Sequence, residues 1–176
     1  DLADLLRAAD IAAAMSVEGL LGTDRAFAAD LVALRPQVGQ QASAANLTAL
    51  LAGSAIVASH RTGDPRVQDA YSLRCAPQVH GAARDALAFG ETCAERELSA
   101  AIGYPVLLAD GRIESVGNFH GAPLAHAFDL LAIVVADVAA MSERRTDRFL
   151  DAARSHGLPP FLADEPGVDS GLMIAQ

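Results

Sequence analysis

The chain has 176 residues, enough for one domain with a buried core, and 52% of them are hydrophobic, which excludes a disordered segment. The formal net charge of −9 opposes binding to nucleic acid or to anionic membrane surfaces. All 13 basic residues are arginine, which excludes chemistry that needs a lysine of this chain, such as a pyridoxal Schiff base or a P-loop phosphate contact.

The apolar composition indicates a mainly α fold. Thirty-eight residues are alanine and only 5% are aromatic. Small, unbranched side chains favour closely packed helices over a β-sandwich. Apolar residues at helical spacing, ended by turn residues, predict a first helix from Asp1 to about Leu20, a second from Ser43 to His60 and a third from Pro77 to about Ala101.

A small β-hairpin and one long helix are expected in the second half. Asp110-Gly111 is a favoured tight turn and predicts a hairpin over residues 106–116. The long helix is expected over residues 121–151 and would be packed in a bundle. Its predicted seam repeats at steps of four and three: Leu124, Phe128, Leu131, Val135 and Val138.

The most apolar window, residues 122–141, lies within that helix. It is interrupted by His126, Asp129 and Asp137, which a bilayer would penalise. We therefore expect a buried helix and no membrane contact. Cys75 and Cys93 lack CxxC spacing, which favours reduced thiols in a cytoplasmic protein over a disulfide.

The five histidines show no metal-ligand spacing such as HExxH, so no metal site is predicted. The charged run Ser142-Glu143-Arg144-Arg145, with Arg148, is expected to form ion pairs within the helix and between subunits. We assign these residues no catalytic role.

Gln68, Tyr71 and Arg74 recur at every third position. On one helical or 3₁₀ turn, this spacing would place an amide, a phenol and a guanidinium along one side. A guanidinium can bind a carboxylate through two hydrogen bonds, and a phenol can donate, accept or transfer a proton. The trio would suit an amino-acid ligand. The alternative is that these residues cap the helix beginning at Pro77.

Five segments carry a family resemblance, in family order. They are Arg66-Val67-Gln68-Asp69-Ala70-Tyr71-Ser72-Leu73-Arg74-Cys75-Ala76-Pro77-Gln78-Val79, Gly117-Asn118-Phe119-His120-Gly121, Ser142-Glu143-Arg144-Arg145, Gly157-Leu158-Pro159-Pro160-Phe161-Leu162 and Asp169-Ser170-Gly171-Leu172-Met173-Ile174-Ala175-Gln176. Together they resemble the aromatic amino acid lyase family over essentially the whole chain, and most closely its histidine branch.

The resemblance implies a long-helix bundle in a homotetramer whose active sites draw residues from three subunits. It implies that Arg74 binds the substrate carboxylate, that Tyr71 is catalytic beside the amine, and that Gln68 hydrogen-bonds in the same pocket. Phe119 would pack against the cofactor, a methylidene-imidazolone formed from an Ala-Ser-Gly tripeptide. No such tripeptide occurs in this chain. The alternative for Phe119 is an ordinary core residue at a helix start.

The implied activity is elimination of ammonia from L-histidine to give urocanate, the first step of histidine degradation. Residues 1–176 would form the central segment of one larger lyase domain, without its cofactor-bearing N-terminal part and its C-terminal part. Alone, the segment is expected to be inactive. The alternatives are an aminomutase, a tyrosine or phenylalanine ammonia-lyase of the same fold, or a non-catalytic helical assembly fragment.

One turn departs from the family pattern. Gly103-Tyr104-Pro105 stands where the family usually has Asp-Asn-Pro, and Ser99 replaces a frequent Asn. Replacing turn-forming polar side chains by a glycine and a phenol is expected to alter this bend. Specificity or activity would change with it.

Overall fold

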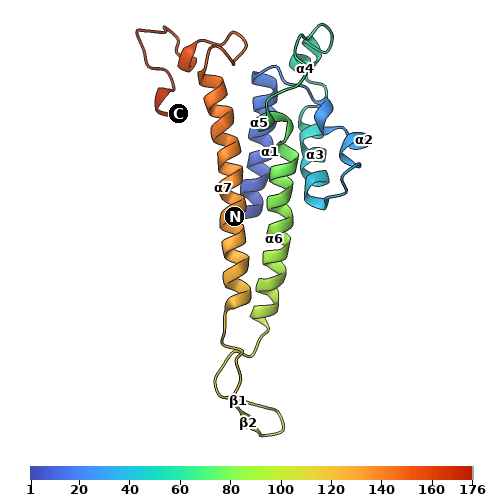
Figure 1. Ribbon diagram of the computed structural model, residues 1–176, viewed down its shortest axis with the longest axis vertical. Helices are drawn as coiled ribbons and strands as arrows, with labels where there is room; N and C mark the ends of the chain where they lie inside the picture. The colour runs from blue at the N-terminus through green and yellow to red at the C-terminus, as the bar shows by residue number, and fades with distance from the viewer. Residues whose placement is uncertain (176) are drawn as a thin grey trace.

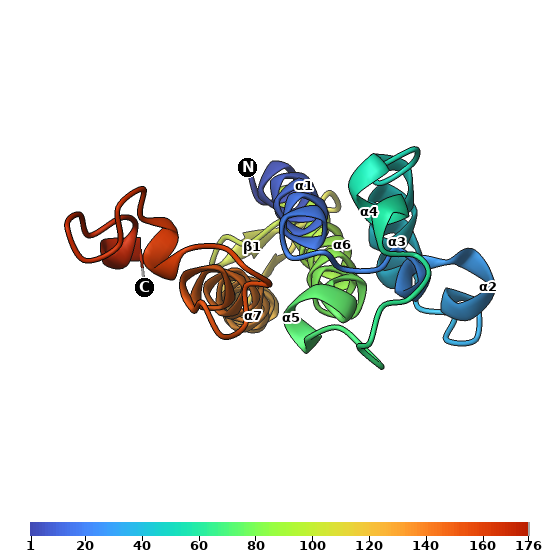
Figure 2. The same cartoon turned by 90° about the horizontal axis from the view of Figure 1, so that it is seen from above.

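Three long helices run side by side along the molecule in the computed structural model, which describes residues 1–175 (Figures 1 and 2). The shorter elements cover one side of this trio or follow its ends. The long helices are α1 (Leu2–Gly19), α6 (Ala76–Leu98) and α7 (Ala122–Leu150), and the shorter elements are η1 (Arg25–Phe27), α2 (Ala29–Val32), α3 (Val38–Leu50), α4 (Ala55–Ser59), α5 (Tyr71–Arg74), β1 (Val106–Leu107), β2 (Ile113–Glu114), η2 (Pro160–Leu162) and η3 (Met173–Ala175).

The first, third and last predicted helices are confirmed as α1, α6 and α7. The second prediction, one helix over residues 43–60, is wrong at its start and in the middle, whereas its end agrees with the end of α4 at Ser59. The helix α3 begins earlier, at Val38, and ends at Leu50, because Gly53 has a φ of 76° and breaks the run before Ser54. The hydroxyl of Ser54 then accepts a hydrogen bond from the Val57 amide and starts α4.

The core lies in two clusters. The larger one joins α1 to α3, and its largest fully buried side chains are Val17, Leu20, Phe27 and Leu47. The smaller one joins α1, α6 and α7 through Leu6, Ala83 and Val138. Small residues in the middle of α6 let its neighbours approach closely.

The closest approach is between α3 and α6. A Cβ atom added to Gly81 would collide with the backbone of Gln40, and one added to Gly39 would collide with the carbonyl of Gly81. Glycine at both positions therefore allows the two backbones to touch. Asp85 of α6 stabilises this contact between the helices, since its carboxylate accepts a 2.8 Å hydrogen bond from the Gly39 amide of α3.

A buried polar network ties α1, α3 and α6 together. Its centre is Asp10, which is 1% exposed. One carboxylate oxygen accepts hydrogen bonds from Ser43 (2.6 Å) and His80 (2.8 Å), and the other accepts from Asn46 (2.8 Å) and Arg84 (2.6 Å). Four donors from two neighbouring helices satisfy a carboxylate that burial would otherwise destabilise.

The expected hairpin is present, but its strands are only two residues long. Val106 pairs with Glu114 and Leu107 with Ile113, and Gly111 in the turn has a φ of 86°. The hairpin projects beyond the far ends of α6 and α7 (Figure 1). It is therefore an excursion between two helices, as the sequence predicted.

The long helix α7 is less buried than the sequence predicted. Val138 is buried, but Phe128 of the predicted seam is 59% exposed. The other three positions of the predicted seam, Leu124, Leu131 and Val135, are half-buried, and Leu131 lies against Gly90 of α6. The periodicity therefore located the helix and most of its packed side, and only Phe128 departs from the predicted seam.

By length and composition alone, α7 could cross a membrane. Its most apolar 18-residue window has a mean hydropathy of 1.9, and only 11% of that window is buried within the chain. The expectation of a buried helix is therefore wrong for the single chain. The exposed positions include two carboxylates, Asp129 and Asp137.

Candidate active site

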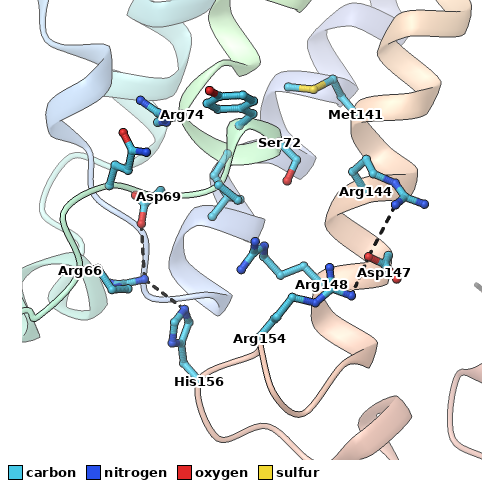
Figure 3. Close-up of a pocket in the computed structure, with 14 residues that line it drawn as sticks. Arg66, Asp69, Ser72, Arg74, Met141, Arg144, Asp147, Arg148, Arg154 and His156 are labelled. Atoms are coloured by element: carbon cyan, nitrogen blue, oxygen red, sulfur yellow. Dashed lines mark hydrogen bonds and ion pairs between the residues drawn. The ribbon is translucent and has the colours of Figure 1, made fainter.

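Gln68, Tyr71 and Arg74 line one cavity of about 560 Å³ between α5, the loop before it and the last turns of α7. Met141, Arg144 and Arg148 of α7 form the opposite wall (Figure 3). The convergence of the three predicted residues on one cavity is thus present in the single chain.

The trio does not lie on one helical turn, contrary to the prediction. The helix α5 begins at Tyr71, and Gln68 is in the extended loop that precedes it. The capping alternative also fails, because α6 begins at Ala76 and its N-cap, Cys75, has no side-chain cap hydrogen bond. The three side chains line the cavity instead.

Arg74 and Tyr71 contact each other directly. The guanidinium carbon of Arg74 lies 4.7 Å from the centre of the Tyr71 ring. This cation–π contact orients the guanidinium while leaving its N–H groups free for a ligand. The Nε of Arg74 is buried and has no hydrogen-bond partner within residues 1–175. No residue that the structure describes forms an ion pair with Arg74, so its outer N–H groups can bind an anion in the cavity.

The loop that carries Gln68 is fixed by its neighbours Arg66 and Asp69. Asp69 is buried, accepts a 2.7 Å hydrogen bond from the Thr23 amide, and lies 3.4 Å from the Arg66 guanidinium. Arg66 also donates to the carbonyl oxygens of Leu20 and Leu21 at the end of α1. The end of α1 thereby holds the loop at the rim of the cavity.

The side of the cavity opposite the loop is formed by α7, which is bonded to α5 through Arg145. Arg145 is 2% exposed and donates a 3.2 Å hydrogen bond to the carbonyl of Ser72 in α5. Burial lowers the pKa of the Arg145 guanidinium from its ordinary value.

The predicted ion pairs of the charged run are present only in part. The prediction is confirmed for Arg144, which pairs with Glu143. Arg145 instead forms a buried hydrogen bond to backbone, and Arg148 has no ion pair with any residue that the structure describes.

The cavity is electropositive although the chain is acidic. Five arginines and two aspartates line it. His156, at its edge, lies 3.2 Å from a guanidinium nitrogen of Arg66. Burial, and then the charges of Arg66 and Arg148, lower the pKa of His156. A carboxylate ligand would therefore be attracted to this cavity by its general charge as well as by Arg74.

Phe119, the fourth predicted site residue, does not join the cavity. It contacts Tyr104, next to the hairpin, whereas α5, which carries Tyr71 and Arg74, lies at the opposite end of α6 from the hairpin (Figure 1). The 23 residues of α6 correspond to about 34 Å at 1.5 Å per residue. Phe119 is 60% exposed, so the alternative of an ordinary core phenylalanine is wrong.

Sequence reasoning did not single out Arg66, Asp69 or His156 at the cavity. Arg66 and Asp69 flank Gln68 within the quoted motif, and a buried carboxylate beside an arginine could have been suspected there. No sequence motif marks His156 as a site residue, because it reaches the cavity only through the fold of the segment after α7. Arg148 was assigned to surface ion pairs, yet its guanidinium points into the cavity (Figure 3).

The structure thus defines a helical-bundle protein whose electropositive cavity, lined by an amide, a phenol and a guanidinium, is suited to a carboxylate ligand. The sequence profile of the family described as aromatic amino acid lyase matches residues 1–176. The chain belongs to the aromatic amino acid lyase family.

Relatives of known activity are similar over the whole chain. A histidine ammonia-lyase of Streptomyces coelicolor is 62% identical over 176 residues, all of this chain and 34% of that protein. One from Anaeromyxobacter sp. is 54% identical over 170 residues, 96% of this chain and 33% of that protein. The chain therefore spans about a third of the length of these relatives.

Solved structures of the family share the fold. A histidine ammonia-lyase from Trypanosoma cruzi superposes with a TM-score of 0.84 at 39% identity, covering 97% of this chain and 31% of that one. A tyrosine aminomutase from Streptomyces globisporus superposes with a TM-score of 0.87 at 32% identity, covering 97% and 36%. The mainly α fold with its small hairpin is thus confirmed.

Proposed function

We propose that the chain is the central segment of a histidine ammonia-lyase, which eliminates ammonia from L-histidine to give urocanate. The longer protein is called the parent below. The similarity to histidine ammonia-lyases at up to 62% identity supports the substrate, and the cavity supports the chemistry. Residues 1–176 would form part of one larger lyase domain, in a cytoplasmic protein whose two cysteines, Cys75 and Cys93, are free thiols.

The single observation that carries the proposal is the state of Arg74. Its stacking on Tyr71, and the absence of an ion pair with any residue that the structure describes, leave a preoriented guanidinium at a cavity of amino-acid size. A substrate carboxylate would accept two parallel hydrogen bonds from this guanidinium. That contact would fix one end of the substrate, so that its amine and β-carbon lie over the phenol.

Tyr71 and Gln68 would then act on the held substrate. Tyr71 is 70% exposed in the chain, so its hydroxyl can reach a ligand without moving the helix. It would hydrogen-bond to the amine or move a proton there. Gln68 would donate or accept a hydrogen bond from the loop side of the cavity.

The parent needs an electrophile, because ammonia is a poor leaving group and the β-proton of histidine is barely acidic. A methylidene-imidazolone formed from Ala-Ser-Gly elsewhere in the parent would make the amine a better leaving group. The residues present fit such a planar group, since Phe119 exposes its ring beside the hairpin, and an aromatic wall packs against a planar ring and keeps out water. No metal or pyridoxal phosphate would take part.

The separation of Phe119 from Arg74 supports a homotetramer with shared sites. One chain cannot bring both residues to one substrate across the length of α6. Subunits packed antiparallel along α6 and α7 would bring the hairpin end of one to the cavity of another. The same packing would cover the exposed side of α7, including Phe128, with protein and not with lipid.

The test is an assay of the parent with L-histidine, in which urocanate is followed by its ultraviolet absorbance. We expect urocanate, and no cinnamate or coumarate from phenylalanine or tyrosine. A β-amino acid product would instead establish an aminomutase, and cinnamate or coumarate would overturn the substrate. Release of ammonia by the purified 176-residue segment would contradict the requirement for an electrophile supplied from outside it.

A further inference from the structure

The turn that departs from the family pattern, Gly103-Tyr104-Pro105, contacts the segment that carries Phe119. The rings of Tyr104 and Phe119 pack edge to face, with centroids 5.8 Å apart and planes at 81°. This is a preferred geometry for an aromatic pair, because the positive edge of one ring meets the negative face of the other. The phenol introduced by the departure is therefore a specific neighbour of a predicted site residue.

Two hydrogen bonds strengthen the same junction. Ser115 donates from its hydroxyl to the Tyr104 hydroxyl at 3.3 Å, and Asn118 donates from its side chain to the Ala101 carbonyl at 3.3 Å. The amide of His120 donates to the Gly117 carbonyl at 3.0 Å, so Phe119 lies inside a closed turn. The backbone of Phe119 is fixed by this turn, and its ring direction is fixed by Tyr104.

The pair remains open on its outer side. Tyr104 is 63% exposed and Phe119 60% exposed, although the two rings contact each other. The exposed side of the Phe119 ring is therefore suited to contact a planar aromatic group while Tyr104 holds the ring in place.

We propose that Tyr104 is a positioning residue of the parent enzyme, holding the Phe119 ring so that the exposed side of that ring packs against a planar group of the active site. This inference rests on the proposed function. Tyr104 acts through Phe119, so the two residues must be energetically coupled.

The first test is a double-mutant cycle on the parent, read as the dissociation constant for urocanate measured by calorimetry without ammonia. Tyr104→Leu is expected to weaken urocanate binding about three- to tenfold in the wild-type background, the range expected for losing one edge-to-face pair. In the Phe119→Ala background, the same change should have no further effect. Tyr104→Phe, which keeps the ring edge, should restore binding.

The matched control is Leu107→Ala, because Leu107 is in the same hairpin and is exposed to a similar degree, 69%. It should leave urocanate binding unchanged. An equal loss from Tyr104→Leu in both backgrounds would overturn the proposal, as would a loss from Leu107→Ala as large as that from Tyr104→Leu.

A second readout does not depend on activity or on ligand. The parent carrying 4-fluorophenylalanine at position 119 should show a ¹⁹F resonance that moves with Tyr104→Leu and stays in place with Tyr104→Phe. A resonance unmoved by Tyr104→Leu overturns the inference whatever the parent binds. A parent that shows the shift but neither binds urocanate nor deaminates histidine would refute the proposed function and the positioning role in it, and would keep only the ring contact.

Discussion

Asp10 and His80 are joined by a 2.8 Å hydrogen bond in the interior of the bundle, where their side chains are 1% and 0% exposed. Burial alone would raise the pKa of the Asp10 carboxyl, but hydrogen bonds from His80, Ser43 and Asn46, with the charge of Arg84, lower it below its ordinary value. The network therefore stabilises the fold in a pH-dependent way.

Asp10→Ala is predicted to destabilise the parent by about 3–5 kcal/mol, because it leaves buried donors and the Arg84 charge without a partner. Urea unfolding at fixed protein concentration measures this. A folded-state pKa below the unfolded value of about 3.9 means that the contribution is complete above that pH and is lost as the pH falls through the folded value.

The difference between wild type and Asp10→Ala should therefore be constant near neutral pH and should shrink only below about pH 4. Asp4→Ala is the control, because Asp4 forms an exposed pair with Arg7 and should cost little. A difference that grew as the pH fell would contradict the sign of the shift.

Gly81→Ala is predicted to destabilise the parent by about 1–3 kcal/mol or to prevent its folding, because the added methyl group would force α6 away from the backbone of α3. Thermal unfolding of the variant measures the cost. Gly117→Ala is the control, since an added Cβ there meets no atom within 4 Å. Equal stability of Gly81→Ala and wild type would show that the two helices are not in contact at this point.

Tyr71→Phe is predicted to lower kcat for histidine by about 10²- to 10⁴-fold, the usual contribution of a positioned proton-transfer group. The ring and its contact with Arg74 remain, so KM should change little. Steady-state kinetics of the parent give both values. A variant that raised KM and kept kcat would make Tyr71 a binding residue only.

Mixing two inactive parents tests whether sites are shared between subunits. Arg74→Gln and Phe119→Ala subunits, unfolded together and refolded at equal amounts, should regain activity in about a quarter of the sites, because those sites receive intact residues from different chains. The same proteins mixed without unfolding are the control. No regain after refolding would place Arg74 and Phe119 of one site in the same chain.

The sequence predicted helices best where periodicity and stop signals agreed. The helix α7 was located within one or two residues, because its apolar repeat is long and is followed by Gly157-Leu158-Pro159-Pro160. The break at Gly53 was missed, since the apolar residues on both sides continue a helical spacing. The exposure of Phe128 was missed for a related reason: several adjacent stripes of α7 are apolar, and periodicity cannot tell which one meets α6.

The sequence predicted which residues line the site, but not how the backbone arranges them. Gln68, Tyr71 and Arg74 share a cavity as expected, but the extended backbone before Tyr71 removes Gln68 from the helix. The distance between Phe119 and Arg74 depends on the straight course of α6, which no local motif encodes. Asp69 is near Arg66 in the chain, but His156 becomes a neighbour of Arg66 only through the fold of the segment after α7.

The binding of two ligands that differ only by a carboxylate tests the role of Arg74 most directly. Urocanate and 4-vinylimidazole share the ring and the double bond, and only urocanate has the carboxylate. We predict that Arg74→Gln weakens urocanate binding to the parent about 10- to 100-fold, the usual value of a charged hydrogen-bonded pair, and leaves 4-vinylimidazole binding unchanged. The control is Arg61→Gln, which removes an exposed partner of Asp24 and should affect neither ligand. Equal weakening of both ligands, or no weakening of urocanate, would contradict the assignment of Arg74 as the carboxylate-binding residue.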